Sequence, residues 1–203
     1  MLSPYAMRQS LPQRRLSAKL VSLDLGATAR MTIALFAVTA LQTILVRLPR
    51  VGFLFEYVDF VLILTVFVGV QPRALRAALV GMAGGLLQDL ILGILYGANG
   101  FVKMLIGYTL AAASVKFSLD SKVTRLLVLP LASVTNTGLF AFFLYFFLML
   151  PPGATFRDVV RIGMVSLLGN GVAGLLLFPV ADRWLGKWVA VRSNDDPIAP
   201  RAF

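Results

Sequence analysis

The sequence predicts an all-α, polytopic membrane protein with six transmembrane helices. Of the 203 residues, 59% are hydrophobic and only 14% are charged, whereas soluble domains have roughly 45–50% apolar and ~25% charged residues. A chain of this length leaves much of its surface outside its own core, so the excess apolar surface must face lipid. The apolar residues also fall into separate segments, and a helix needs about 20 of them to cross the hydrocarbon layer.

Six apolar segments follow a basic N-terminal stretch. Their connections contain Pro and Gly, and loops this short make neighbouring spans antiparallel. The second segment is short and carries Asp59. The chain then divides into a basic cytoplasmic or interfacial segment (1–30), a transmembrane domain (31–190) and a short cytoplasmic tail (191–203). The segments run near 31–48, 57–71, 74–93, 100–117, 124–150 and 159–181, with turns at Pro72, at 97–100 and at 151–153.

The N-terminal segment contains no apolar run that resembles a signal peptide. Leu16, Leu20 and Leu23 recur at helical spacing, with basic residues on another face. This pattern suits a short helix on the membrane surface, although two prolines and a low apolar content are equally consistent with disorder.

The basic residues predict the orientation. With the N-terminus in the cytoplasm, all but five of the 19 Lys and Arg residues fall on the inner side. Cytoplasmic loops carry such an excess, so both termini are expected in the cytoplasm. The net charge of +10 is then explained by anionic lipid head groups, and no nucleic-acid partner is expected.

Composition also argues against several kinds of catalysis. The chain has no Cys and no His, which removes thiolate chemistry, the commonest metal ligand and the usual general base. A nucleophilic Ser would depend on Lys103 or a carboxylate, and an aspartyl dyad would require Asp59 and Asp89 to share a proton. We therefore expect no enzymatic activity, cofactor or metal.

Small and polar residues on the helices indicate close packing. Gly81, Gly85 and Asp89 share one face of the third segment, and small residues allow membrane helices to approach one another. The same faces could instead form a ligand site. The candidate contacts of this kind are Gly81, Gly85, Asp89, Asn136, Asn170 and Gly174.

Three ionisable residues are expected to converge near the outer face. Asp59 begins the second segment, Asp89 ends the third, and Lys103 opens the fourth. A charge inside a bilayer is costly and is usually paired, which predicts a polar cluster. Alternatively, Lys103 extends to the head groups and Asp59 lies at an interface.

A family resemblance follows from the order of these motifs. The run GMAGGLLQD at residues 81–89, followed by Gly97-Ala98-Asn99, resembles the rod shape-determining protein MreD family. The stretch YVDFVL at 57–62 is similar to the start of that family's second span, and 170–183 to its last helix. The resemblance covers 31–190, and the basic N-terminal extension departs from it.

Membership would imply a non-enzymatic scaffold in the bacterial inner membrane, acting in peptidoglycan synthesis and cell shape. Its partners in the cell-wall elongation complex (elongasome) would be MreC, the RodA glycosyltransferase and a class B penicillin-binding protein, besides membrane lipids. The family fold is similar to that of the substrate-binding components of energy-coupling-factor transporters, so vitamin binding is the alternative function. The Ala-x-x-x-Ala motif usual in the first span of those components is absent, because larger residues follow Ala34, Ala37 and Ala40 at that spacing.

Overall fold

The computed structural model describes residues 25–50, 52–92, 96–117, 119, 121–147, 153 and 155–186. Within these ranges all regular secondary structure is α-helical, which confirms the predicted fold class. The predicted surface helix at Leu16–Leu23, most of the N-terminal segment and the tail at 191–203 lie outside the described residues. The helices are α2 (Leu25–Val46), α3 (Gly52–Phe55), α4 (Phe60–Gly69), α5 (Ala74–Leu92), α6 (Ala98–Ser114), α7 (Lys122–Phe146) and α8 (Phe156–Trp184).

Four of these helices, α2, α5, α7 and α8, are long and apolar enough to cross a membrane. Their outer faces are strongly hydrophobic, and only 17% of the apolar stretch of α7 is buried inside the protein. Exposed side chains on α2, α7 and α8 include Phe36, Phe142 and Leu176. Apolar surface of this extent requires a lipid environment, and the chain is a helical membrane protein.

The number of six spans stays a prediction, because two helices are shorter than the others. Helix α6 has 17 residues, close to the lower limit of about 17 for a span. Helix α4 has only ten, or about 15 Å at 1.5 Å per residue, roughly half of the hydrocarbon thickness.

Helix α4 forms the core of the molecule. All ten of its residues are buried, and it contacts α2, α5, α6, α7 and α8. The sequence predicted a helix from residue 57, but α4 begins at Phe60 because the Asp59 side chain accepts a hydrogen bond from the backbone N–H of Leu62. Asp59 is therefore an N-cap residue in an extended linker.

Helices α5 and α6 form the closest helix pair. A Cβ atom on Gly81 or Gly85 of α5 would collide with the backbone of Lys103 or Asn99 on α6. Gly107 of α6 is equally close to the backbone carbonyl of Ala77. The predicted turn at 97–100 is shorter than expected, since α6 already begins at Ala98 and only Gly97 is left-handed, with φ of 94°.

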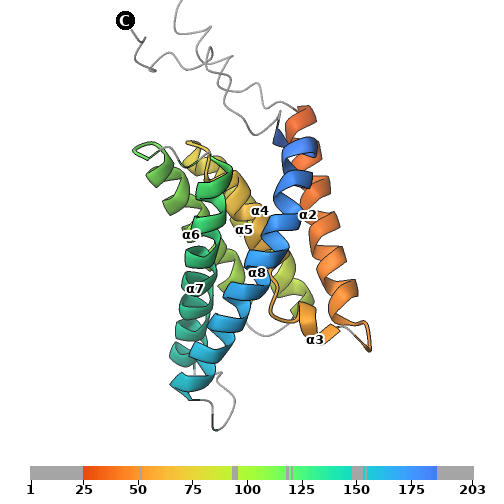
Figure 1. The fold of residues 1–203 in the computed structure, drawn as a ribbon, viewed down its shortest axis with the longest axis vertical. Coiled ribbons are helices and arrows are strands. Elements are labelled where there is room, and N and C mark those ends of the chain that lie inside the picture. The colour runs from red at the N-terminus through yellow and green to blue at the C-terminus, as the bar shows by residue number, and fades with distance from the viewer. Residues whose placement is uncertain are drawn as a thin grey trace, which may run out of the picture.

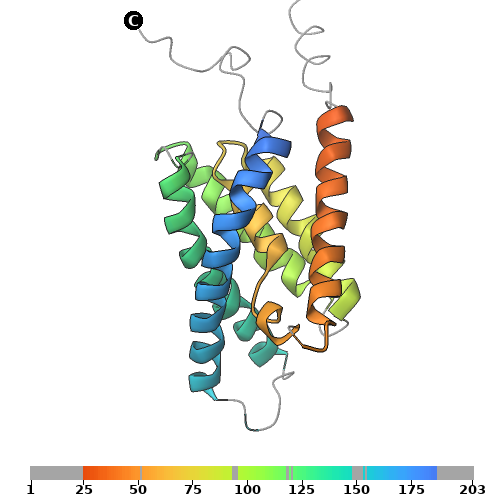
Figure 2. The same cartoon turned by 45° about the vertical axis from the view of Figure 1, so that its right-hand side comes forward.

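The outer helices enclose this core. Helices α7 and α8 lie side by side, and α2 stands at the opposite edge of the bundle (Figures 1 and 2). The start of α2 and the end of α8 lie at the same end of the molecule (Figure 1). At that end Arg125 of α7 pairs with Asp182 of α8 at 2.6 Å.

Candidate functional site

A buried ion pair joins α6 to the start of α4. The Nζ of Lys103 lies 2.7 Å from Oδ2 of Asp59, and the Lys103 side chain is 0% exposed while that of Asp59 is 17% exposed. The interpretation that Lys103 extends to the head groups is therefore wrong. Its ammonium points inward because the α4 cap supplies a carboxylate within the bundle, which compensates a charge removed from water.

Asp89 belongs to the same site but does not touch Lys103. Lys103 donates to Oδ1 of Asn99 at 3.1 Å, and Nδ2 of Asn99 donates to Oδ1 of Asp89 at 2.8 Å. The Asp89 carboxylate also accepts the backbone N–H groups of Gly97 (2.9 Å), Asn99 (3.2 Å) and Gly100 (3.2 Å). Asp89 of α5 thus satisfies the free N–H groups at the start of α6.

Two glutamine side chains extend the site toward α2. The Nε2 of Gln88 donates to Oδ1 of Asp59 at 3.0 Å and to Oε1 of Gln42 at 3.1 Å. The same Gln42 oxygen accepts the backbone N–H of Phe60 at 3.3 Å. Oε1 of Gln88 is buried and has no hydrogen-bond partner among the described residues.

Asn170 and Ser133 connect the site to α8 and α7. Asn170 Oδ1 accepts the backbone N–H of Asp59 at 2.7 Å, and Asn170 Nδ2 donates to Oγ of Ser133 at 3.1 Å. Asn170 is the middle residue of α8, so the start of α4 meets α8 halfway along that helix. We call the set the polar network; it comprises Gln42, Asp59, Gln88, Asp89, Asn99, Lys103, Ser133 and Asn170.

The remaining predicted contacts have separate surroundings. Gly81 and Gly85 pack on the α6 backbone, and Gly174 of α8 packs on the side chain of Leu129. Asn136 is not joined to the polar network by a hydrogen bond among the described residues, and its Oδ1 is buried without a partner there. The glycines therefore serve packing within the chain.

Sequence reasoning overlooked the role of Gln42 and Gln88. Gln88 stood inside the motif next to Asp89, and Gln42 is an amide within an otherwise apolar segment. Polar amides in membrane helices usually bond to a neighbouring helix, which is the signal that could have identified both residues.

The network can fasten helices, and its charged groups are already engaged. Asp59, Asp89 and Lys103 each bond to at least two other groups. A general acid or base must reach a substrate proton, which would require these bonds to break. Among the described residues there is also no cluster of three acidic, His or Cys side chains that could hold a metal.

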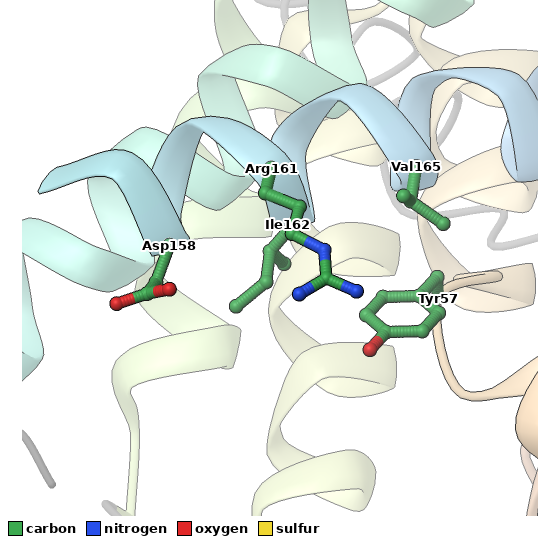
Figure 3. A pocket seen from close by; sticks show the side chains of 5 residues that line it. All are labelled: Tyr57, Asp158, Arg161, Ile162 and Val165. Atoms are coloured by element: carbon green, nitrogen blue, oxygen red, sulfur yellow. The ribbon is translucent and has the colours of Figure 1, made fainter. Parts of the chain in front are cut away.

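A separate hollow lies along the first turns of α8. It has a volume of about 400 Å³ and is lined by Tyr57, Asp158, Arg161, Ile162 and Val165 (Figure 3). None of these side chains belongs to the polar network.

Fold and site together define a class: a helical membrane protein in which a short buried helix is held by a network of paired polar side chains. Comparisons of the chain with protein-family models, with curated proteins and with solved structures give no significant match.

Proposed function

We propose that this protein is a non-enzymatic membrane scaffold of the bacterial cell-wall elongation complex, of the MreD kind. The proposal starts from the ordered motifs that resemble this family over residues 31–190. It places the chain in the inner membrane, with both termini cytoplasmic and MreC as the direct partner. RodA and the class B penicillin-binding protein join in the larger complex.

One observation carries the proposal: the residues of the main motif contact one another. Gly81 and Gly85 press against the backbone of α6, and Asp89 binds the backbone at Gly97 and Asn99. The motif thus builds a helical hairpin. A pattern of residues that specifies a rigid hairpin suits a protein whose task is to present fixed helix surfaces.

The polar network supports a scaffold over an enzyme. Lys103 and Asp59 neutralise each other, and Asp89 is occupied by the start of α6. Charged groups that are paired and hydrogen-bonded in this way make one packing arrangement more favourable than its alternatives. Rigidity of this kind is useful in a scaffold.

Gly138 of α7 is the most informative candidate for contact with a partner. A Cβ there would meet nothing within 4 Å, so this residue faces open space outside the chain. Asn136, two residues away, lies on another side of the helix, and its Oδ1 is covered by the chain itself. A small residue on a lipid-facing surface lets another membrane helix approach closely. The face of α7 around Gly138 is therefore where we place the transmembrane span of MreC.

Affinity purification of the tagged full chain in mild detergent tests the proposal. MreC should be recovered with the wild-type protein, and Gly138→Leu should lower its recovery severalfold at unchanged protein level. Gly171→Leu is the matched control, because a Cβ on Gly171 also meets nothing within 4 Å but lies on α8. Recovery of a transporter ATPase in place of MreC, together with binding of a radiolabelled vitamin, would establish the alternative function.

A further inference from the structure

The hollow beside α8 is built by one helix face and one linker. Asp158, Arg161, Ile162 and Val165 recur at helical spacing and share a face of α8. Further along that face, Gly169 is covered by the linker, since a Cβ there would lie 3.1 Å from the Val58 side chain. Before that point the face is exposed, and Tyr57 of the same linker forms the opposite wall.

The linker beside the hollow is attached to α8 and to the core. Asp59 donates its backbone N–H to Asn170, one residue beyond Gly169. The next residues of the linker enter α4, which is buried on all sides. Tyr57 is therefore held beside α8 by contacts that belong to the core.

Arg161 brings to this hollow a guanidinium whose hydrogen-bond donors are not taken by a carboxylate of the described residues, although Asp158 lies near enough to attract it electrostatically. Both hydrogen bonds of the Asp158 carboxylate go to Thr155, from its backbone N–H at 2.8 Å and from its Oγ1 at 2.7 Å. Arg161 has no ion pair within the part of the chain that the structure describes. Its guanidinium extends along the hollow toward Tyr57 (Figure 3).

The other lining residues give the hollow a polarity gradient. Arg161 and the Tyr57 hydroxyl can donate hydrogen bonds, whereas Ile162 and Val165 continue the face toward the middle of α8 as apolar surface. Arg and Tyr near the end of a span are typical of the membrane interface. The hollow is an open surface depression of about 400 Å³, so a molecule bound in it would also remain in contact with the bilayer.

We propose that this hollow binds the anionic head group of a membrane amphiphile. The phosphate or carboxylate binds the Arg161 guanidinium, whose planar array of donors matches such oxyanions, and accepts a hydrogen bond from Tyr57. The first part of the hydrocarbon chain lies along Ile162 and Val165. The site is independent of the scaffold role, since its residues lie outside the polar network and on other parts of the chain than Gly138 of α7.

Binding of defined lipids to the purified full chain tests this site. The protein in neutral detergent is titrated with dioleoylphosphatidylglycerol, with dioleoylphosphatidylcholine and with inorganic phosphate, and bound lipid is measured by native mass spectrometry. We expect phosphatidylglycerol to bind best. Arg161→Gln should weaken it about tenfold, the effect of losing one charge-assisted hydrogen bond, and Tyr57→Phe should weaken it less.

Arg157→Gln is the matched control, because Arg157 is exposed on the first turn of α8 but does not line the hollow. If Arg157→Gln and Arg161→Gln lowered the affinity for phosphatidylglycerol equally, diffuse surface charge would explain the binding, and the proposed site would be wrong. If inorganic phosphate bound as tightly as phosphatidylglycerol, the hollow would be a site for free anions, and the proposal of a membrane amphiphile would be wrong.

Photocrosslinking tests the position of the hydrocarbon chain of the lipid in otherwise unchanged protein. The Val165→benzoylphenylalanine variant should crosslink to phosphatidylglycerol in preference to phosphatidylcholine. The same substitution at exposed Val160 should show no such preference. Equal crosslinking of the two lipids at position 165 would contradict the proposal.

Discussion

Two ion pairs in the described part of the chain differ in their surroundings. Lys103 and Asp59 meet inside the bundle, where the lysine is 0% exposed. Arg125 and Asp182 meet where α7 begins and α8 ends, and the Asp182 side chain is 32% exposed. The distances between the charged atoms are nearly equal, at 2.7 Å and 2.6 Å.

The two pairs differ in their surroundings and not in the distances between their charged atoms. Gln88 of α5 donates to Asp59, Asn99 of α6 accepts from Lys103, and Gln42 of α2 accepts in turn from Gln88. Arg125 instead has a buried Nε without a partner among the described residues, and its guanidinium stacks over the Phe67 ring at 5.1 Å. We call Arg125 and Asp182 the peripheral pair. Solvent reaches its Asp182 side chain, whereas the Lys103 side chain is 0% exposed, so losing one partner should cost more in the buried pair. The buried pair should therefore dominate stability.

The largest effect should come from removing the buried lysine charge. Lys103→Met leaves the Asp59 carboxylate inside the bundle without its counter-charge, and breaking a buried pair in this way costs about 3–5 kcal/mol. We expect a large fall in thermal stability in detergent and in the amount of folded protein recovered from membranes.

A second substitution identifies the partner of Lys103. Asp59→Asn, added to Lys103→Met, removes the unpaired charge but keeps an oxygen for the N–H of Leu62, so most of the stability should return. Asp89→Asn should not restore it, because that carboxylate accepts three backbone N–H groups at the start of α6. If Asp89→Asn restored stability to Lys103→Met and Asp59→Asn did not, the pairing of Lys103 with Asp59 would be wrong.

An intermediate effect is expected where α5 meets α6. In Gly85→Ala the new methyl group would collide with the backbone of Asn99 and Gly100, and overpacking of this kind costs about 1–3 kcal/mol. Gly171→Ala is the matched control on α8, because a Cβ there meets nothing within 4 Å. That variant should be neutral or gain up to about 1 kcal/mol from helix propensity. Equal melting temperatures for the two variants would contradict a packing role for Gly85.

Hydrophobic patterning explains why the helical class and the α5–α6 hairpin were predictable. The spacing of Gly81, Gly85 and Asp89 already placed small residues and one acid on a common face. The pairing was not predictable, because both Asp59 and Asp89 were available to Lys103. Choosing between them requires knowing that Asp59 caps a helix that begins only at Phe60.

The point at which Asp59 meets the other helices could not be predicted from the sequence either. An apolar run such as 57–71 has the same composition whether it forms a full span or a ten-residue buried helix. The short helix places Asp59 beside the middle of α8, where Asn170 binds its backbone. Tertiary contacts with Gln42, Gln88 and Asn170 decide that arrangement, and no local pattern encodes them.

The smallest effect should come from the peripheral pair, and its salt dependence completes the comparison. Asp182→Asn removes the charge of the more exposed partner, whose side chain is 32% exposed, and keeps an oxygen that can accept a hydrogen bond from Arg125. The melting temperature in low salt should therefore fall less than in Lys103→Met or Gly85→Ala. In about 1 M salt the Debye length is ~3 Å, and ions reach Asp182, so the wild-type protein should lose part of its advantage over Asp182→Asn. The gap between wild type and Lys103→Met should persist in the same salt, because ions do not reach a side chain that is 0% exposed. If salt narrowed both gaps equally, the two pairs would share one environment, and the distinction between a buried and a peripheral pair would be wrong.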